Sequence, residues 1–414
     1  MSLTTKVLLG MGLGIVLGLL LNLGNFNAAG GFVNTYFVDG FLFVIGKLFI
    51  NALKMLVVPL VFFSLICGVC GIGDLSALGR VGSRSFALYI LTTVLAITLA
   101  ITIAASIGIG EGMDLVSVAS FSANVAPPIS DVIISIIPSN PIQAMAEGDM
   151  LSLIFFSILV GISILMLGDR AKSVIAAAEV ANDIMMKMVT IVMAAAPYAV
   201  FALMTQAMAN LGVELLGQLA GYVVVLVGTL LIHLFVVLML VLNVFSGLSP
   251  SIFLSKIREA QLFAFSTASS NATIPVTLKV VTEKMGVNNA VASFTVPFGA
   301  TINMDGTAIM QGVATVFIAN IYGVDLGLLG YLTVISMSVL ASIGTAGVPG
   351  VGLIMLAMVF EQVGLPIEGI GLVLGVDRLM DMVRTAVNVS GDAVVTTIIA
   401  KSEGKLDLGV YNKQ

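Results

Sequence analysis

Long apolar runs, separated by short polar connections, make up most of this chain of 414 residues. A helix that crosses the hydrocarbon core of a membrane needs roughly 20 mostly apolar residues. Residues 85–109 and residues 219–245 are two clear runs of that length. The pattern predicts an all-α polytopic membrane protein, because a membrane β-barrel would show short segments of alternating hydrophobicity instead.

The composition strengthens this interpretation, since 59% of the residues are hydrophobic and 9% are charged. A typical soluble domain has about 25% charged residues. No basic cluster suggests nucleic-acid binding. The two cysteines, Cys67 and Cys70, form a CxxC pattern without a second pair, so we expect them to be packing residues. Residues 7–23 follow Lys6 and lack a small-residue cleavage site after them, which favours a first span over a signal peptide.

The distribution of basic residues predicts the topology, because Lys and Arg collect in cytoplasmic loops. No Lys or Arg occurs between Arg84 and Arg170, or between Lys284 and Arg378. With Lys6 inside, the distribution fits eight spans and two cytoplasmic termini. The predicted spans are residues 7–23, about 40–70, 85–109, about 150–168, about 180–208, 219–245, about 290–320 and 367–400.

Two further segments do not read as ordinary spans. The centre of the first, STASSNATIP, is too polar to face lipid, and the second is broken by SIGTAGVPGVG at 342–352. Irregular backbone at membrane depth requires cover from protein or a water-filled cavity. We predict two opposed re-entrant hairpins, an inner one at 250–284 and an outer one at 329–364, in halves of inverted topology. Paired interruptions of this kind indicate the binding site of a secondary transporter, although two unrelated glycine-rich kinks are the alternative.

Charged residues cluster in the sequence DRLMDMVRTAVNVSGD at 377–392. At about 100° per residue, five of its polar side chains fall on one helical stripe about 80° wide, and Arg378 lies outside that stripe. The residues of the stripe are Asp377, Asp381, Arg384, Asn388 and Asp392. Charge at the centre of a bilayer costs a few kcal/mol per residue, so the stripe must face a polar interior. Mutual neutralisation of Asp381 and Arg384, or a structural role between helices, would be simpler explanations.

An excess of carboxylate favours binding of mobile cations, since pairing within the stripe leaves Asp377, Asp392 and Asp305 without obvious partners. The sequence NMDG at 303–306 predicts an opened helix whose carbonyl oxygens and carboxylate suit a hard cation. With no His or Cys nearby, nothing suggests zinc. Arg384 offers a planar fork for a carboxylate, and Asp381 can hold an ammonium group. The backbone N–H groups of the hairpin tips favour a second carboxylate, so the substrate expected is an acidic amino acid.

At three motifs the chain resembles the glutamate/aspartate transporter family, the dicarboxylate/amino acid:cation symporters. The motifs lie in residues 264–306, 339–352 and 375–392, and the similarity runs through almost the whole chain. The resemblance implies a prokaryotic homotrimer in the inner (plasma) membrane. Each protomer would have a scaffold, residues 1–75 and 113–212, and a transport core, residues 76–112 and 213–414, that slides like an elevator. The outer hairpin is the candidate gate.

The resemblance also implies site residues. The family's substrate contacts would correspond to Ser269, Ser270, Thr307, Val348, Gly352, Asp381, Arg384, Thr385 and Asn388. Its sodium ligands would correspond to Asn303, Asn388 and Asp392 at one site, to Thr301, Met304, Ser342, Ile343 and Thr345 at a second, and to Tyr89, Thr92, Thr93, Asn303 and Asp305 at a third. Asp377 would be a supporting residue.

One departure bears on the coupling ion. Ala268 precedes Ser269 where some relatives carry arginine, and Arg378 is a candidate source of that positive charge. This is similar to some bacterial members that couple to protons. The carboxylates of Asp305 and Asp392 favour sodium. Relatives that carry neutral amino acids usually lack the arginine found at 384, which favours an acidic substrate.

We therefore predict a secondary active transporter, not an enzyme, that imports aspartate, glutamate or both by symport with sodium and needs no organic cofactor. A proton-coupled symporter is the main alternative, followed by a neutral amino acid or dicarboxylate symporter. The sequence GIGD at 71–74 matches a pattern of intramembrane aspartyl proteases, but no YD pair accompanies it. An ion channel would not need a paired ammonium and carboxylate site.

Overall fold

The computed structural model describes residues 3–24, 26, 31–70, 81–112, 134, 137–345, 347 and 349–413. In these ranges the chain is nearly all helical, and extended pairing is limited to an isolated antiparallel bridge between Val287 and Leu406. The GIGD sequence at 71–74 and Val348 lie outside the described residues.

The helices up to residue 246 cover the region of the first six predicted spans, and α5 lies in a segment predicted as a loop. They are α1 (Leu3–Leu23), η1 (Val33–Leu42), α2 (Phe43–Cys70), α3 (Ser83–Ile107), α5 (Pro141–Glu147), α6 (Met150–Met166), η3 (Gly168–Ala171), α7 (Lys172–Ala194), α8 (Ala196–Leu211), α9 (Val213–Ile232), η4 (His233–Val237) and α10 (Leu238–Ser246). The elements η1 and η4 are π-helical turns that continue directly into their neighbours.

The helices after residue 246 include the hairpins and the polar stripe. They are α11 (Pro250–Thr267), α12 (Ser270–Lys279), η5 (Val280–Lys284), α13 (Asn289–Ile302), α14 (Asp305–Ile321), α15 (Gly327–Gly344), α16 (Val351–Gln362), η6 (Ile367–Gly369), α17 (Ile370–Ser402) and α18 (Leu408–Asn412).

Several of these helices are long and apolar enough to cross a membrane. Among the described residues, four continuous helices qualify, at Thr5–Leu23, Val33–Cys67, Ser83–Ile107 and Leu215–Ser246. A fifth span results if α7 and α8, bent by 48° at Ala195, are taken together. A polytopic membrane protein is therefore supported, and the full count of eight spans stays a prediction, because the other helices are short, interrupted or charged.

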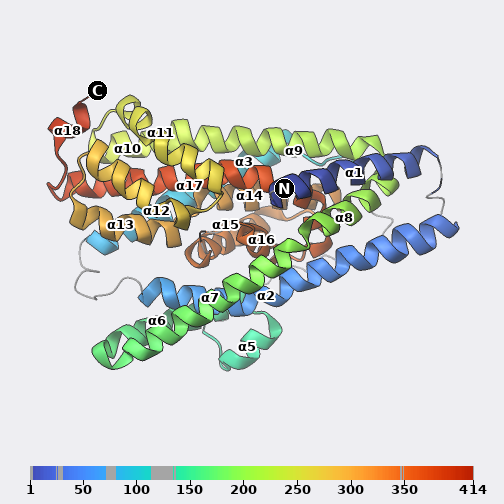
Figure 1. The fold of residues 1–414 in the computed structure, drawn as a ribbon, viewed down its shortest axis with the longest axis horizontal. Helices are drawn as coiled ribbons and strands as arrows, with labels where there is room; N and C mark the ends of the chain where they lie inside the picture. Colours follow the sequence, from blue (N-terminus) through green and yellow to red (C-terminus); the bar gives the residue numbers. More distant parts are fainter. Residues whose placement is uncertain are drawn as a thin grey trace.

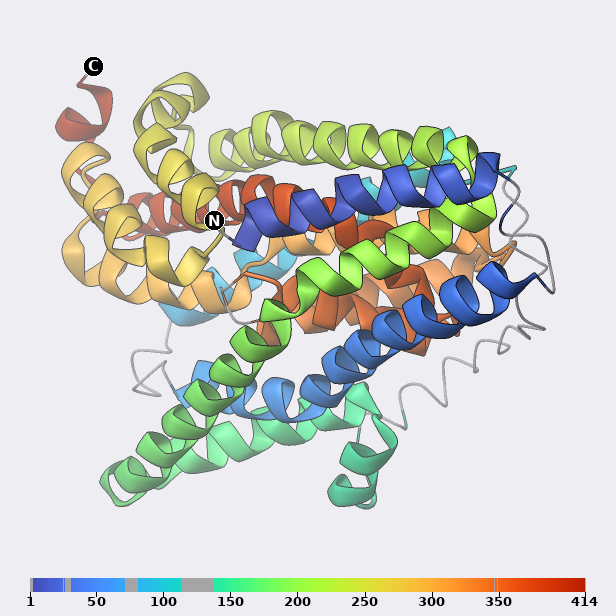
Figure 2. The same cartoon turned by 45° about the vertical axis from the view of Figure 1, so that its right-hand side comes forward.

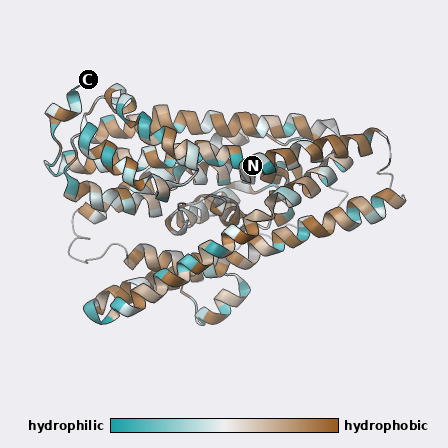
Figure 3. Ribbon diagram, viewed as in Figure 1, coloured by the Kyte–Doolittle hydropathy of each residue, from teal (hydrophilic) through white to brown (hydrophobic). Residues whose placement is uncertain are grey.

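The helices form two groups, and α2 reaches the second group through contacts with α15 and α16. Figure 1 shows α2, α6 and α7 along one side of the molecule, with α9 to α18 on the other. The helix α2 packs against α6 and α7, and α1 packs along α8 in front of the core in Figure 2. The helix α17 contacts α11, α13 and α14, so the charged stripe lies inside the bundle. Figure 3 shows apolar residues along the long helices and polar residues gathered near α18 and the turn between α6 and α7.

Each segment predicted as a hairpin contains two helices with a short connection between them. Between α11 and α12 the chain turns at Ala268. Its φ is 50°, and no other non-glycine residue in the described ranges has a positive φ. Ser269 then caps α12 by accepting a hydrogen bond from the N–H of Ala272. Between α15 and α16 the turn ends at Gly350, with φ of 88°. Entry of the two hairpins from opposite sides of a membrane stays a prediction.

The C-terminal tail closes the base of the inner hairpin. Tyr411 in α18 is fully buried, and its hydroxyl donates a hydrogen bond of 3.0 Å to the carbonyl oxygen of Ser249. The Lys256 ammonium donates to the carbonyl oxygen of Val410 over 2.8 Å and lies over the Tyr411 ring. Burial raises the pKa of Tyr411 to about 12, so its hydroxyl stays a donor at neutral pH. These contacts hold α11 against the end of the chain.

Candidate functional site

The NMDG sequence interrupts a helix in the middle of the bundle, as its composition predicts. The helix α13 ends at Ile302 and α14 begins at Asp305. Asn303 (φ −102°, ψ 84°) and Met304 (φ −108°, ψ 52°) both have non-helical backbone angles. Because the helical hydrogen bonds stop here, backbone groups of the break are available to neighbouring helices.

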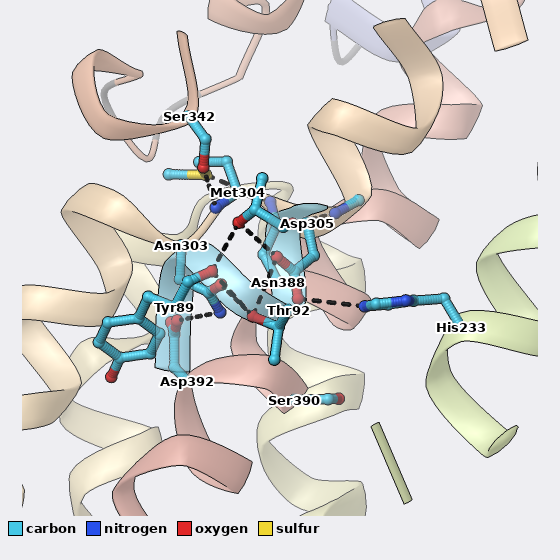
Figure 4. Close-up of polar contacts among 12 residues, drawn as sticks. Tyr89, Thr92, His233, Asn303, Met304, Asp305, Ser342, Asn388, Ser390 and Asp392 are labelled. Carbon is cyan, nitrogen blue, oxygen red and sulfur yellow. Dashed lines mark hydrogen bonds and ion pairs between the residues drawn. The ribbon is translucent and has the colours of Figure 1, made fainter. Parts of the chain in front are cut away.

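Asn303 joins the break to two helices. Its amide nitrogen donates to Oδ1 of Asp392 on α17 over 3.2 Å, and its amide oxygen accepts from the Thr92 hydroxyl on α3 over 3.1 Å. Both partners are buried, and Figure 4 shows the three side chains converging between Tyr89 and Asp305. The structure therefore brings together residues that the sequence assigned to two different cation sites.

Asp305 is fully buried, and both of its carboxylate oxygens have partners. The Thr93 hydroxyl donates to Oδ1 over 2.8 Å, and the Thr92 hydroxyl lies 3.4 Å from the same oxygen. On the other side, Nε2 of His233 lies 3.1 Å from Oδ2. The sequence-based expectations that Asp305 lacks a partner and that no histidine is near NMDG are both wrong. His233 is 72 positions away in sequence, and only the packing of η4 against the bundle reveals the contact.

Backbone groups of the break hold α15 and α17. The N–H of Met304 donates to the Ser342 hydroxyl over 2.8 Å, and that hydroxyl donates to the carbonyl oxygen of Ile302 over 2.7 Å. The N–H of Gly306 donates to Oδ1 of Asn388 over 2.7 Å. The break is thus the point where the outer hairpin and the polar stripe meet.

Arg384 lies at the centre of the stripe and is 0% exposed. Its Nη2 donates to Oδ1 of Asp381 over 2.8 Å, and its Nη1 lies 2.9 Å from Oδ1 of Asp377. The expectation that Asp377 has no partner is therefore wrong. The Asp377 contact lacks hydrogen-bond geometry, so Nε and Nη1 of the guanidinium have no hydrogen-bond acceptor among the described residues. Two carboxylates therefore share this guanidinium.

Small residues allow neighbouring helices to approach Arg384 closely. A Cβ atom on Gly306 would lie 2.6 Å from the carbonyl oxygen of Arg384, which is closer than packed atoms allow. A Cβ atom on Gly352 would lie 3.3 Å from Cγ2 of Thr307 and 3.5 Å from Nη1 of Arg384. Gly352, Thr307 and Arg384 therefore lie around one point, and their role as substrate contacts stays a prediction.

The tips of the two hairpins touch each other above this point. The carbonyl oxygen of Gly347 accepts from the hydroxyl of Ser269 over 2.7 Å and from the N–H of Asn271 over 3.0 Å. The N–H of Gly350 donates to Oδ2 of Asp381 over 3.2 Å. Asp381 and Arg384 are both buried below these contacts and thus shielded from solvent.

The hydroxyls of four other candidate residues donate hydrogen bonds to backbone carbonyl oxygens. The hydroxyls of Thr301, Thr345 and Thr385 donate to carbonyl oxygens of their own helices, and the Tyr89 hydroxyl donates to the carbonyl oxygen of Thr295. Ser270 and Ile343 are buried. Nη1 of Arg378 lies 3.9 Å from Oδ2 of Asp381, so this residue adds positive charge at the edge of the stripe.

The sequence of this chain is similar to those of known transport proteins over nearly its whole length. The sequence profile of the sodium:dicarboxylate symporter family matches residues 3–402. The chain is 31% identical to the proton/sodium-glutamate symport protein of Bacillus caldotenax, with 100% of this chain and 96% of that protein covered. It is 34% identical to the proton/glutamate-aspartate symporter of Escherichia coli (strain K12), with 98% and 94% covered.

A third relative differs in its substrate. The chain is 33% identical to the C4-dicarboxylate transport protein of Bacillus subtilis (strain 168), with 88% of each protein covered. The names of these relatives give acidic amino acids or C4-dicarboxylates as substrates. Two of the names also give the coupling ion, as protons or as protons and sodium. The features common to these substrates are small size and negative charge.

Proposed function

Because the chain belongs to the sodium:dicarboxylate symporter family, we propose that it imports aspartate, glutamate or both by symport with sodium ions. As a symporter-family protein with several apolar helices, it is an integral protein of the plasma membrane. The substrate and the coupling ion are the specific parts of the proposal, and both are argued from the buried charges.

The observation that carries the proposal is the position of Arg384 beside Asp381, below the touching hairpin tips. An acidic amino acid carries one ammonium group and two carboxylates. N–H groups on Nε and Nη1 of the guanidinium have no hydrogen-bond acceptor among the described groups and can donate to the side-chain carboxylate. Asp381 then releases part of its contact with Arg384 and accepts the ammonium group. Backbone N–H groups of the hairpin tips receive the remaining carboxylate.

The sodium part of the proposal is supported by the oxygen-rich region around Asn303. The hydroxyls of Thr92 and Thr93 both lie within hydrogen-bond distance of Asp305, and Asp392 contacts the Asn303 amide. Hard cations prefer oxygen ligands of this kind. Asp305 and Asp392 place two carboxylates in the interior, where unpaired negative charge is unfavourable. Bound sodium would neutralise this charge and so stabilise the site.

Coupling follows from the connections between the two regions. Asn388 on α17 lies one turn from Arg384 and accepts a hydrogen bond from Gly306 of the break. Ser342 joins the same break to the outer hairpin. Cation binding at the break would therefore order both the substrate stripe and the outer hairpin. We propose that this hairpin is the gate and that the core, residues 76–112 and 213–414, moves past a scaffold in a homotrimer.

Uptake of labelled aspartate into proteoliposomes tests the proposal. An inward sodium gradient should drive accumulation, and unlabelled glutamate should compete. Uptake driven by a proton gradient in the absence of sodium would support the proton-coupled alternative. The relative named for C4-dicarboxylates supports a second candidate substrate class, and succinate tests it because succinate lacks the ammonium group. If succinate competes as well as aspartate, Asp381 is not an ammonium contact.

A further inference from the structure

His233 is the sole histidine of the chain, and its side chain is 0% exposed. It is the first residue of η4, a π-helical turn between α9 and α10. Such turns contain an extra residue, shift the side chains that follow, and occur often at functional sites. Figure 4 shows the imidazole directed at Asp305 from the side opposite Tyr89, and Nε2 lies 3.1 Å from Oδ2 of that carboxylate.

The hydrogen of this contact belongs to the imidazole. An ionised carboxylate only accepts hydrogen bonds, so Nε2 of His233 is the donor. Nδ1 is buried and has no hydrogen-bond partner among the described residues. A hydrogen on Nδ1 would be a buried donor without an acceptor, which is unfavourable. The ring that fits these contacts is neutral, with its hydrogen on Nε2, and it leaves the negative charge of Asp305 intact.

The two oxygens of Asp305 are held from opposite sides. Oδ1 faces the hydroxyls of Thr93 and Thr92, and Oδ2 faces His233. Rotation about the terminal torsion of an aspartate is soft, so contacts at both oxygens are needed to fix the carboxylate plane. A lysine or arginine in place of His233 would also hold Oδ2, but its charge would compete with a cation. A neutral donor fixes the group without that competition.

We propose, on the basis of the sodium symport proposed above, that His233 is a positioning residue for the cation site. It holds Oδ2 of Asp305 so that Oδ1 faces the oxygens of Thr92, Thr93 and Asn303. The imidazole does not contact the cation or the substrate. Its effect reaches the cation through the orientation of Asp305, in the way that a hydrogen-bond partner behind a metal ligand tunes the metal.

Two substitutions separate this role from simple packing. His233→Leu replaces the imidazole with an apolar side chain of similar size and so removes the hydrogen-bond donor. His233→Gln keeps an N–H donor on an uncharged side chain. Thr229→Val is the matched control, because Thr229 is buried one turn earlier on the same face of the helix and its hydroxyl donates to the carbonyl oxygen of Val225 in the same helix.

Each purified variant is titrated with NaCl at constant ionic strength, with choline chloride as the balancing salt. One readout is thermal stabilisation by Na⁺ without substrate, and the other is aspartate binding at saturating Na⁺. Loss of the partner of a metal ligand lowers metal affinity by about 10- to 100-fold. We expect His233→Leu to raise the half-maximal Na⁺ concentration at least tenfold, with aspartate affinity at saturating Na⁺ changed by less than about threefold.

The conservative variant decides between positioning and packing. His233→Gln should restore the half-maximal Na⁺ concentration to within about threefold of the wild type, and Thr229→Val should not change it. The inference is overturned if His233→Leu responds to Na⁺ like the wild type, or if it weakens Na⁺ and aspartate binding equally. It is also overturned if a folded His233→Gln behaves like His233→Leu. If the wild type itself shows no response to Na⁺, the sodium symport proposal fails first and the inference fails with it.

Discussion

The N–H of Asn271 donates to the carbonyl oxygen of Gly347 over 3.0 Å, so the tip of the inner hairpin is hydrogen-bonded to the tip of the outer hairpin. These residues are 76 positions apart, and the contact lies above Asp381 and Arg384. In the mechanism proposed above, the substrate passes between the two tips, and this contact has to open for the gate to work.

A disulfide across the tips should lock this gate. Cβ of Ser270 lies 3.0 Å from the position of a Cβ on Gly347, so the two tips need to separate only slightly to reach the Cβ–Cβ distance of about 3.8 Å in disulfides. In a background with Cys67→Ala and Cys70→Ala, oxidation of the Ser270→Cys, Gly347→Cys variant should abolish uptake and trap bound aspartate. Reduction should restore both. The single Gly347→Cys variant is the control, and unchanged uptake by the oxidised double variant would show that the tips do not gate.

Replacement of Arg384 should remove acidic substrates selectively. Arg384→Lys keeps the charge but loses the fork, and we expect aspartate affinity to fall about 100-fold, since hydrogen bonds between charged groups contribute about 1.5–3 kcal/mol. Arg384→Ala should abolish acidic uptake and admit neutral amino acids. It also removes the ion-pair partner of the buried Asp377, at a stability cost of about 3–5 kcal/mol, so folding is checked by size-exclusion chromatography.

The matched control for Arg384 is Arg84→Lys, at an arginine whose Nη1 lies 2.8 Å from Glu403 at the surface. This change should leave aspartate affinity unaltered, because exposed ion pairs contribute little. Intact acidic uptake in Arg384→Ala would refute the charge-matching argument for the substrate.

Asp392→Asn should weaken sodium dependence while preserving the fold. The amide oxygen of asparagine can still accept from Asn303, so the contact of 3.2 Å survives and only the charge is lost. At an effective dielectric constant of about 20, a carboxylate about 4 Å from a cation contributes about 4 kcal/mol. We expect the half-maximal Na⁺ concentration for uptake to rise at least tenfold. Asp325→Asn, at an exposed residue, is the control, and an unchanged titration in Asp392→Asn would argue for proton coupling.

A methyl group on Gly299 should disturb the proposed cation site around Asp392 through steric overlap, without any change of charge. A Cβ atom there would lie 2.6 Å from Oδ1 of Asp392 and 2.7 Å from the hydroxyl of Tyr89. Gly299→Ala should therefore displace Asp392 and raise the sodium requirement. Gly228→Ala, where a Cβ atom meets no atom within 4 Å, should leave sodium dependence unchanged. Equal sodium titrations for the two variants would place the cation elsewhere.

The sequence predicts the helical class, the family and the main polar residues, because each has a local signal. The family prediction from three motifs is confirmed by the match over residues 3–402. The polar stripe is readable since residues on one helix have fixed angular spacing. The helix break at NMDG is readable because Asn, Asp and Gly are poor helix formers.

The missed contacts join residues that have no such local signal. Asp377 and Arg384 are two turns apart, beyond the spacing at which helical neighbours are expected to pair, and the length of the arginine side chain closes the gap. His233 lies on another helix, and its only sequence signal is that an ionisable residue inside a membrane span is rare. Tyr411 and Ser249 meet through the folding of the tail, which no periodicity encodes.

The most direct test of the central claim is the affinity of the purified protein for aspartate as a function of Na⁺ concentration at fixed pH and ionic strength. Symport with sodium predicts that aspartate affinity rises steeply as Na⁺ increases and that aspartate raises the affinity for Na⁺ by the same factor. Equal aspartate affinity in the absence of Na⁺ and at saturating Na⁺, together with a strong dependence on pH, would contradict it.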